Sequence, residues 1–401
     1  MSIYQRLGVP PVINAAGTLT RLGGTVMLPE VRDAMSEAAC ELVPVDELQA
    51  MASRAIASAC GSEAGLVTSG ASAGLTLAAA ACMAGLDIVK MDRLPGGAGP
   101  RSEIVICRSH RNSYDHAFRV AGATLVEVGF SDRSPGVGVR ETEAWEIDAA
   151  ITENTAAIAY TASASAYPPL SVVSAVARKR RVPVIVDAAG QLPPPSNLRR
   201  FIAEGADLVA ISGGKALRGP QGTGILAGRS DLIASAALQQ LDMDVTFETW
   251  LPPPDLIPRD KLTGAPRHGM GRGFKVSKEQ IVGLVVALGL FTDERAKADY
   301  ARWLEVLHVI ELGLRNCARV QATLVPPRQA LGFPLLEVQL DPKETALTAY
   351  ELVARMKKGR PAIHLGERRL MDGGILVHPA SLDQATARIV LQRLLAELQA
   401  P

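Results

Sequence analysis

The sequence has no surplus of charge of either sign. Its 42 Lys and Arg residues nearly balance 41 Asp and Glu residues, which leaves a net charge of +1 on 401 residues. A balanced chain creates no strong field to attract nucleic acid or an anionic membrane surface. We therefore expect a small-molecule substrate, with neither nucleic acid nor a membrane as a partner.

Cysteine is scarce and scattered, and no two of the five cysteines form a CxxC pair. This spacing favours reduced thiols in a cytoplasmic protein and gives no zinc motif. The N-terminus lacks the basic region and apolar run of a secretory signal. The apolar stretch Ile281–Leu290 is too short to cross a bilayer. We expect a cytoplasmic protein without a bound metal.

Two nucleotide-binding motifs are also missing. Gly213-Gly214-Lys215 is not a phosphate-binding P-loop, because Val209 occupies the first glycine position and Ala216 the Ser/Thr position. The glycines between 219 and 224 do not open a helix after a strand, so they form no dinucleotide fingerprint. The glycine pair before Lys215 therefore does not indicate nucleotide binding, and Lys215 must have another role.

Two short apolar runs rich in β-branched residues, 184–186 and 208–211, predict buried strands. The first ends at Asp187, and the second leads to Ser212 and Lys215. Buried parallel strands present ligand-handling groups at their carboxyl ends, and a buried acid and amine each need a partner. Pyridoxal 5'-phosphate (PLP) uses both, a lysine for its Schiff base and a carboxylate for its pyridinium nitrogen. The alternative is an ordinary buried ion pair.

The segment Leu66–Leu77 predicts a strand, a turn and the start of an Ala-rich helix. Backbone N–H groups at such a helix start, together with the hydroxyls of Ser69 and Ser72, form an anion cradle. The alternative is a simple cap, in which one serine satisfies a free amide of the helix. If Lys215 binds PLP, the anion cradle is favoured over the simple cap, because PLP carries a phosphate that the cradle can hold.

His110 follows the predicted strand Ile104–Cys107, and His116 lies six residues further on. Their spacing is not that of a helical metal pair, and no Cys or acidic ligands accompany them. A ring at the end of this strand is well placed to stack on a flat cofactor. The alternative is a histidine satisfied within its own loop.

Strands and helices alternate from residue 66 to residue 227. This alternation predicts an α/β fold with a large, doubly wound, mostly parallel sheet. Long helices at Lys278–Ala298 and Tyr300–Val320 and three later strands predict a smaller α+β domain. We expect an N-terminal arm and helix (1–45), a large PLP-binding domain (46–258) and a small C-terminal domain (259–401). The predicted later strands are Leu335–Leu340, Ala362–Leu365 and Ile375–His378.

Substrate-binding candidates are few. Arg267, Arg272 and Lys275 lie in a basic, glycine-rich stretch that follows a proline-rich linker. This stretch is either an anion-binding segment or a solvated subunit surface. Thr20, in the N-terminal arm, either reaches a site or satisfies its own turn.

Together, these segments resemble PLP-dependent enzymes of the aspartate aminotransferase fold, fold type I. The chain is most similar to the branch related to bacterial seryl-tRNA selenium transferase, and within it to the D-glucosaminate-6-phosphate ammonia lyase group. The resemblance covers most of the chain. It is carried by Pro11-Val-Ile-Asn-Ala-Ala-Gly17, Val67-Thr-Ser-Gly-Ala-Ser72, His110-Arg-Asn-Ser-Tyr-Asp-His116, Val186-Asp-Ala-Ala-Gly-Gln191, Ser212-Gly-Gly-Lys-Ala-Leu-Arg-Gly-Pro-Gln221 and Lys275-Val-Ser-Lys-Glu279.

The resemblance implies a role for each matching residue. Lys215 would form the Schiff base, Asp187 would pair with the pyridinium nitrogen, and His110 would stack on the ring. Gln191 would lie near the ring hydroxyl. The phosphate would be held by Ser69, Gly70, Ala71, Ser72 and Ser212. Arg267, Arg272 and Lys275 would bind the substrate's carboxylate or phosphate, and the protein would be a homo-oligomer.

The expected reaction is a lyase reaction. A β-hydroxy amino acid or amino-sugar acid, with or without a phosphate, would lose its β-hydroxyl and become a 2-keto acid and ammonia. Without a leaving group, reprotonation on the other face would give a racemase or epimerase, with His110, His116 or Tyr114 as the second acid. Selenium transfer to seryl-tRNA and a non-catalytic binding protein are the remaining alternatives.

Overall fold

The computed structural model describes residues 2–96, 99, 101–130 and 141–399. Contacts between residues divide the chain into two compact units. The large unit comprises Met27–Leu192 and Ser196–Leu290, and the other, here called the C-terminal unit, comprises Met1–Val26, Pro193–Pro195 and Phe291–Pro401. Each unit is described by itself.

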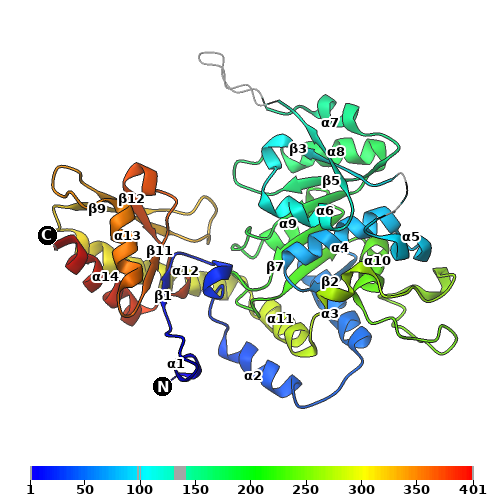
Figure 1. Ribbon diagram of the computed structural model, residues 1–401, viewed down its shortest axis with the longest axis horizontal. Coiled ribbons are helices and arrows are strands. Elements are labelled where there is room, and N and C mark those ends of the chain that lie inside the picture. Colours follow the sequence, from blue (N-terminus) through cyan, green and yellow to red (C-terminus); the bar gives the residue numbers. More distant parts are fainter. Residues whose placement is uncertain (1, 97–98, 100, 131–140, 400–401) are drawn as a thin grey trace. The chain divides into compact units, whose positions relative to one another are not determined.

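The large unit is built on a seven-stranded sheet with the order β2-β8-β7-β6-β5-β3-β4 (Figure 1). Strands β3 to β7 run parallel to one another, whereas β8 is antiparallel to both β7 and β2. The predicted α/β fold with a mostly parallel sheet is confirmed. The strands are β2 (Ala64–Thr68), β3 (Glu103–Cys107), β4 (Thr124–Val128), β5 (Thr155–Thr161), β6 (Val184–Asp187), β7 (Leu208–Ser212) and β8 (Gly224–Gly228).

Helices cover both faces of this sheet. Successive residues of a strand point to opposite faces, yet Val184, Ile185 and Val186 are all fully buried. Helix α4 is buried on nearly every side, and its small residues allow it to pack closely on β7 and β8. The helices are α2 (Pro29–Ala38), α3 (Val45–Cys60), α4 (Ala71–Ala84), α5 (Ile88–Arg93), α6 (His116–Val120), α7 (Ala144–Ala150), α8 (Leu170–Arg180), α9 (Asn197–Ala203), α10 (Ser230–Gln240) and α11 (Lys278–Leu290).

The large unit begins at Met27 and ends at Leu290, whereas the large domain predicted from the sequence comprises residues 46–258. Helix α11 packs against α2 and α3, so all three helices belong to the large unit. The Lys278 ammonium at the start of α11 also donates a hydrogen bond to the carbonyl of Ala38 at the end of α2. Apolar burial and this hydrogen bond hold the chain in the large unit as far as Leu290.

The C-terminal unit contains a three-stranded antiparallel sheet with the order β12-β10-β9, and a separate parallel pair, β1 and β11. The pair joins Ile13 to Ile363 and Ala15 to Leu365, so the N-terminal arm is part of this unit. Its elements are α1 (Ile3–Arg6), β1 (Ile13–Ala15), α12 (Asp293–Leu314), β9 (Val320–Val325), β10 (Leu335–Leu340), α13 (Ala349–Lys358), β11 (Ile363–Leu365), β12 (Gly374–Val377) and α14 (Gln384–Gln399).

Two predicted elements of this region differ from the structure. The helix expected at Lys278–Ala298 is interrupted, because the Thr292 side chain accepts a hydrogen bond from the Arg295 amide and starts α12. The next expected helix, up to Val320, ends at Leu314, and Val320 instead begins β9. Among the described residues, no helix is both long and apolar enough to cross a membrane.

The five cysteines are free thiols in different environments. Cys40 is exposed, whereas burial raises the pKa of Cys60 to about 12 and that of Cys107 to about 11. Burial also raises the pKa of Cys82. Since the thiolate is the reactive form, these three should be inert in the folded protein.

We predict that a thiol reagent labels Cys40 quickly in the native protein and leaves Cys60, Cys82 and Cys107 unmodified. Mass spectrometry of timed samples would identify the labelled positions. Cys40→Ser should remove the fast phase, and denaturant should expose all five thiols. Labelling of Cys60 or Cys107 at the rate of Cys40 would contradict the prediction.

Candidate active site

The register of the sheet gathers the sequence motifs at one edge. Gly224, at the start of β8, pairs with Thr68 at the end of β2 and with Ser212 at the end of β7. The end of β5 is likewise level with the end of β6, because Thr161 pairs with Asp187. The turn after β2, Ser212 and Asp187 therefore share the edge where an α/β sheet binds ligands.

Close backbone packing fixes the loop that carries Lys215. A side-chain carbon at Gly213 would lie 2.3 Å from Thr223 Oγ1, and one at Gly214 would lie 2.4 Å from the Cα of Gln221. The Gly213 amide donates to the Thr223 carbonyl at 2.9 Å. Only glycine fits at these two positions, which explains why two glycines precede the lysine.

Asp187 and Lys215 are both partly buried, and each charge acts on the other. Burial raises the pKa of Asp187, and the Lys215 charge opposes this. Burial lowers the pKa of Lys215, and the Asp187 charge opposes that. The Ala189 amide donates to Asp187 Oδ1 at 3.0 Å, and a side-chain carbon at Gly190 would lie 3.9 Å from Lys215 Nζ. The loop after β6 thus holds the carboxyl and borders the amine.

The N-terminus of α4 is open to an anion. Gly70 precedes the helix with a φ of 89°, and no side chain caps the helix. Neither Ser69 nor Ser72 is therefore the simple cap that the sequence left as an alternative. The free N–H groups of the first turn, which begins at Ala71, carry the positive end of the helix dipole. They suit a phosphate.

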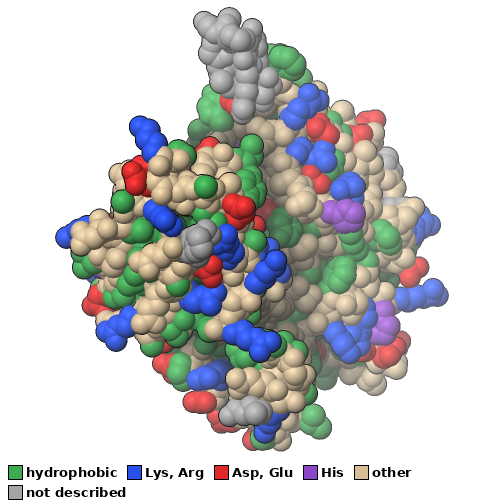
Figure 2. Space-filling model, turned by 60° about the vertical axis from the view of Figure 1, so that its left-hand side comes forward, with side chains coloured by type: hydrophobic (Ala, Val, Ile, Leu, Met, Phe, Trp, Pro, Cys, Tyr) green, Lys and Arg blue, Asp and Glu red, His purple; other side chains and the backbone are tan. Residues whose placement is uncertain are grey.

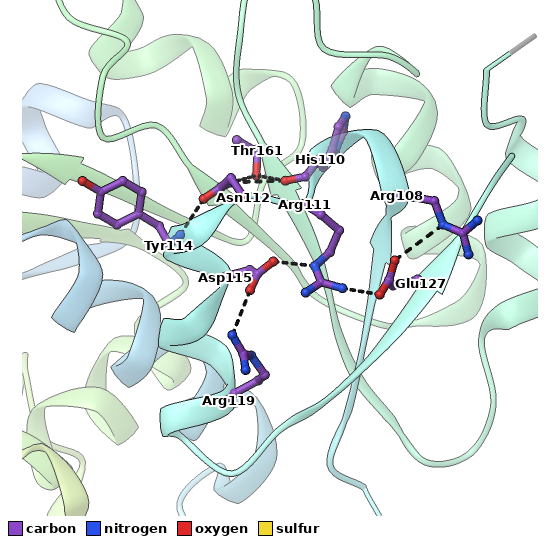
Figure 3. Close-up of polar contacts among 9 residues, drawn as sticks. All are labelled: Arg108, His110, Arg111, Asn112, Tyr114, Asp115, Arg119, Glu127 and Thr161. Carbon is purple, nitrogen blue, oxygen red and sulfur yellow. Dashed lines mark hydrogen bonds and ion pairs between the residues drawn. The ribbon is translucent and has the colours of Figure 1, made fainter. Parts of the chain in front are cut away.

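A polar network holds the segment that carries His110 (Figure 3). Thr161 Oγ1 donates to the His110 carbonyl at 2.9 Å, and Asn112 Nδ2 donates to the same carbonyl at 3.1 Å. Asn112 Nδ2 also donates to Thr161 Oγ1 at 3.1 Å, and Asn112 Oδ1 accepts from the Tyr114 amide at 2.8 Å. The backbone of His110 is thereby tied to the end of β5.

Charged residues extend this network in Figure 3. Arg111 binds both Asp115 and Glu127, and Arg119 lies 3.6 Å from Asp115. Burial works to raise the pKa of Asp115, but its bonds to Arg111 and the charge of Arg119 hold that pKa below its usual value. Asp115 therefore stays ionised and clamps the segment after His110.

The His110 ring is buried and lacks hydrogen-bond partners. It is only 4% exposed, and neither ring nitrogen completes a hydrogen bond within the described residues. Burial lowers its pKa, an effect that the nearby Tyr167 carbonyl partly offsets. The edge of Tyr160 packs on it, with ring centroids 4.6 Å apart. An unpartnered buried imidazole is costly, and a ligand ring or polar group beside it would remove that cost.

Of the remaining predicted site residues, one lies at this edge of the sheet and the others lie outside the strands and α-helices of the two units. Gln191 belongs to the same edge, since its Nε2 donates to the carbonyl of Ala162 at 2.7 Å. Arg272 forms an ion pair with Asp242 at 2.8 Å, so its guanidinium is already engaged. Arg267 and Lys275 lie on either side of Arg272, on exposed loop positions of the large unit. Thr20 is an exposed residue of the C-terminal unit.

Sequence reasoning missed the supports of His110. Tyr160, Thr161 and Asn112 were not assigned any role, although Thr161 is the last residue of β5. The rule that favoured Asp187, a polar residue at the carboxyl end of a buried strand, would have selected Thr161 too. The partners of Asn112 depend on the tertiary structure, so no local pattern indicates them.

Comparisons with known proteins agree with this geometry. Residues 107–243 match the family described as aminotransferase class-V. The chain is 32% identical to 5'-C-glycyluridine monooxygenase-decarboxylase of a Streptomyces species, over 98% of this chain and 90% of the relative. It is 28% identical to D-glucosaminate-6-phosphate ammonia lyase of Salmonella typhimurium, over 98% and 97%. A solved structure of D-glucosaminate-6-phosphate ammonia-lyase superposes with a TM-score of 0.79 and 28% identity, covering 99% of this chain and 98% of that one.

The likeness to these proteins extends over nearly the whole chain, and one edge of the sheet carries the partly buried Asp187 and leads to the partly buried Lys215. Together these findings define the class of the protein. The protein is a PLP-dependent enzyme of fold type I. Within that class, the chain belongs to the aminotransferase class-V family, in the branch that contains D-glucosaminate-6-phosphate ammonia lyase.

The residues at this edge fit PLP. The uncapped start of α4 suits its phosphate, and the unpartnered His110 ring suits its flat ring system. Lys215 would offer an amine to its aldehyde, and Asp187 would offer a carboxyl to its ring nitrogen. PLP has a chemical group complementary to each of these protein groups.

Removal of the Asp187 charge should change the pH at which Lys215 reacts with PLP. The carboxylate raises the pKa of Lys215, so Asp187→Asn should lower that pKa further. Because an amine reacts in its neutral form, the pH midpoint of the PLP reaction should move to lower pH in the variant. Stopped-flow absorbance of PLP-free protein mixed with PLP would measure this midpoint. Lys215→Ala should show no reaction, and an unchanged or higher midpoint in Asp187→Asn would refute the expected coupling.

Gly224 provides a test of the phosphate site. A side-chain carbon there would lie 2.5 Å from the Gly70 carbonyl carbon and 2.6 Å from the Ala71 amide nitrogen. Gly224→Ala should therefore displace the start of α4, lower the free energy of unfolding by about 1–3 kcal/mol and weaken PLP binding. Urea denaturation and equilibrium dialysis would measure the two effects.

Gly222→Ala is the matched control. There the nearest atom is the flexible end of Gln280, 3.2 Å away, so we expect a change within about 0.5 kcal/mol and normal PLP binding. Equal losses of PLP affinity in Gly224→Ala and Gly222→Ala would show that the packing of Gly224 on α4 does not determine PLP affinity.

Proposed function

We propose that the protein is a PLP-dependent lyase that converts a β-hydroxy amino acid or amino-sugar acid into a 2-keto acid and ammonia. The juxtaposition of Asp187, Lys215 and the open start of α4 carries this proposal, together with the full-length likeness to an ammonia lyase. When bound, PLP supplies an electron sink for the negative charge that develops at the substrate's Cα.

In this proposal Lys215 binds PLP and then acts as the base that removes the Cα proton. Its lowered pKa leaves a larger share of neutral amine near pH 7 than an ordinary lysine has. Asp187 would keep the ring nitrogen of PLP protonated. Ser69, Gly70, Ala71, Ser72 and Ser212 would hold the phosphate, His110 would stack on the ring, and Gln191 would lie near the ring hydroxyl.

The names of the two full-length relatives support the substrate class. One refers to a phosphorylated amino-sugar acid, and the other to a glycyl group joined through carbon to a uridine. Both substrates combine an α-amino acid with a hydroxylated sugar skeleton. We propose such a compound for this protein, with or without a phosphate, and Thr20, Arg267 and Lys275 as candidates to contact it. Arg272 would need to leave Asp242 to do so.

The relative of higher identity favours a second candidate. A monooxygenase-decarboxylase, by its name, consumes oxygen and releases the carboxyl group as carbon dioxide. The same charge at Cα arises when the carboxyl group leaves instead of the proton, so the two reactions can use the same residues. The racemase alternative uses the same base and needs a second acid, for which His110, His116 and Tyr114 remain the candidates.

We also propose that the protein works in the cytoplasm as a homo-oligomer and acts on a small molecule. Five free thiols, three of them with a pKa raised by burial, suit the reducing cytoplasm. Apolar side chains such as Leu42 and Leu251 are 94% and 85% exposed, which suits burial in a homo-oligomer. Basic and acidic side chains are interspersed over the face in Figure 2, in keeping with a small-molecule substrate rather than nucleic acid.

The test incubates PLP-loaded protein with D- and L-β-hydroxy amino acids and amino-sugar acids, each with and without phosphate. We expect a 2-keto acid and ammonia in equal amounts, with no oxygen uptake and no product from Lys215→Ala. Oxygen uptake with carbon dioxide release would establish the second candidate. Exchange of the Cα proton with deuterium, without release of either product, would establish the racemase.

A further inference from the structure

The large unit contains a cavity of about 520 Å³ at the edge of its sheet opposite to the candidate active site. Val182, just before β6, and Asp207, just before β7, line this cavity, as does Arg229, just after β8. Asp187 ends β6 five residues after Val182, and at about 3.3 Å per residue the two are roughly 16 Å apart. A small ligand in this cavity would therefore not reach Lys215.

Two arginines of this cavity have no acidic partner. Arg178 and Arg181 line the cavity, are exposed, and form no ion pair within the described part of the chain. The two residues between them behave differently, because Lys179 and Arg180 both bind Asp148, at 3.4 and 2.7 Å. The cavity thus has two guanidinium groups available to a ligand.

The acid and the third arginine of the cavity already bind one another. Asp207 Oδ1 accepts from Arg229 at 3.4 Å, and Asp207 Oδ2 accepts from the Val184 amide at 2.8 Å. Arg229 also binds Asp231 at 2.7 Å. Asp207 is the one acidic residue among the described residues that line the cavity. The positive charge of Arg178 and Arg181 is therefore not cancelled.

The end of α8 does not account for both of these arginines. Cations stabilise the last turn of a helix, and Lys179 and Arg180 already lie there. The carbonyl groups of Ala177 and Arg178 accept hydrogen bonds from backbone amides, at 3.0 and 3.2 Å. Arg181 has a φ of 57°, in the left-handed region where glycine usually ends a helix. Helix capping thus gives no reason for an arginine at this position.

A buried hydroxyl group also lines the cavity. Ser174 is only 3% exposed, and its Oγ completes no hydrogen bond within the residues that the structure describes. A side-chain carbon at Gly205 would lie 3.1 Å from Ser174 Oγ and 3.4 Å from Arg178 Nη2, so these two donors meet at one place on the wall. A buried hydroxyl without a partner is costly, and a ligand oxygen would provide the partner.

We propose that this cavity binds the phosphate group of a small phosphorylated ligand, with Ser174, Arg178 and Arg181 as its donors. A phosphate monoester carries a charge of about −1.5 to −2 at pH 7, which matches the two arginines. Guanidinium groups offer paired N–H donors that suit phosphate oxygens. The cavity is larger than a phosphate, and none of the described residues that line it is aromatic, so a hydroxylated rather than an aromatic body fits beside the phosphate.

Calorimetry on the full-length protein loaded with PLP would test this proposal, because the cofactor then fills its own phosphate site. The probes are inorganic phosphate, glycerol 3-phosphate and, as the match without a phosphate, glycerol. We expect both phosphates to bind and glycerol not to bind. Binding of neither phosphate would overturn the proposal.

Neighbouring arginines provide matched variants. Arg178→Gln and Arg181→Gln should each weaken phosphate binding by roughly tenfold, because each removes a charge-assisted hydrogen bond. Arg180→Gln removes the same charge from the same helix end but should change the affinity by less than about twofold, because Arg180 binds Asp148. Equal effects of the three substitutions, or unchanged affinity in all of them, would place the bound phosphate elsewhere and overturn the proposal.

Ser174→Ala separates a ligand contact from a structural role. Since Ser174 Oγ has no partner within the described residues, its loss should leave thermal unfolding of the ligand-free protein unchanged or slightly raise its temperature. The same substitution should weaken phosphate binding by about two- to tenfold. Lower thermal stability with unchanged affinity would show that the hydroxyl serves the fold and would overturn its assignment. Binding needs no turnover, so failure of the lyase proposal would leave these tests intact.

Discussion

One edge of the sheet in the large unit brings together a partly buried amine and a partly buried carboxyl. Neither group is favourably placed alone, since burial lowers the pKa of Lys215 and raises that of Asp187. Their mutual attraction offsets only part of this cost. A cofactor that bonded to the amine and paired with the carboxyl would remove the remaining cost.

Close packing of backbone around these groups makes the arrangement rigid. Gly213 and Gly214 pack on residues 221–223, and Gly224 packs on the start of α4. The sheet register sets Gly224 between the ends of β2 and β7, so the helix start and the lysine loop hold one another in place. The start of α4 and the loop that carries Lys215 therefore have a fixed separation. Such preorganisation would lower the entropic cost of binding a rigid cofactor.

The C-terminal unit is held together by pairings between residues that are far apart in the sequence. Strand β1 pairs with β11, and the His378 amide donates a hydrogen bond to the Ala15 carbonyl at 2.9 Å. These contacts make the N-terminal arm part of the C-terminal unit. Burial lowers the pKa of His378 to about 4, so its ring is neutral near pH 7.

The sequence by itself determined the fold class, the strand that ends at Asp187, the strand that leads to Lys215, and the turn at Ser69–Ser72, because strand periodicity and helix starts are local signals. It also carried a resemblance strong enough to indicate PLP. Only the tertiary structure decided that α4 is uncapped, that Arg272 pairs with Asp242, and that Thr161 and Asn112 support His110. It also placed the arm beside β11 and ended the helices at Leu290 and Leu314. These features depend on pairings between residues distant in sequence, whose geometry no local pattern contains.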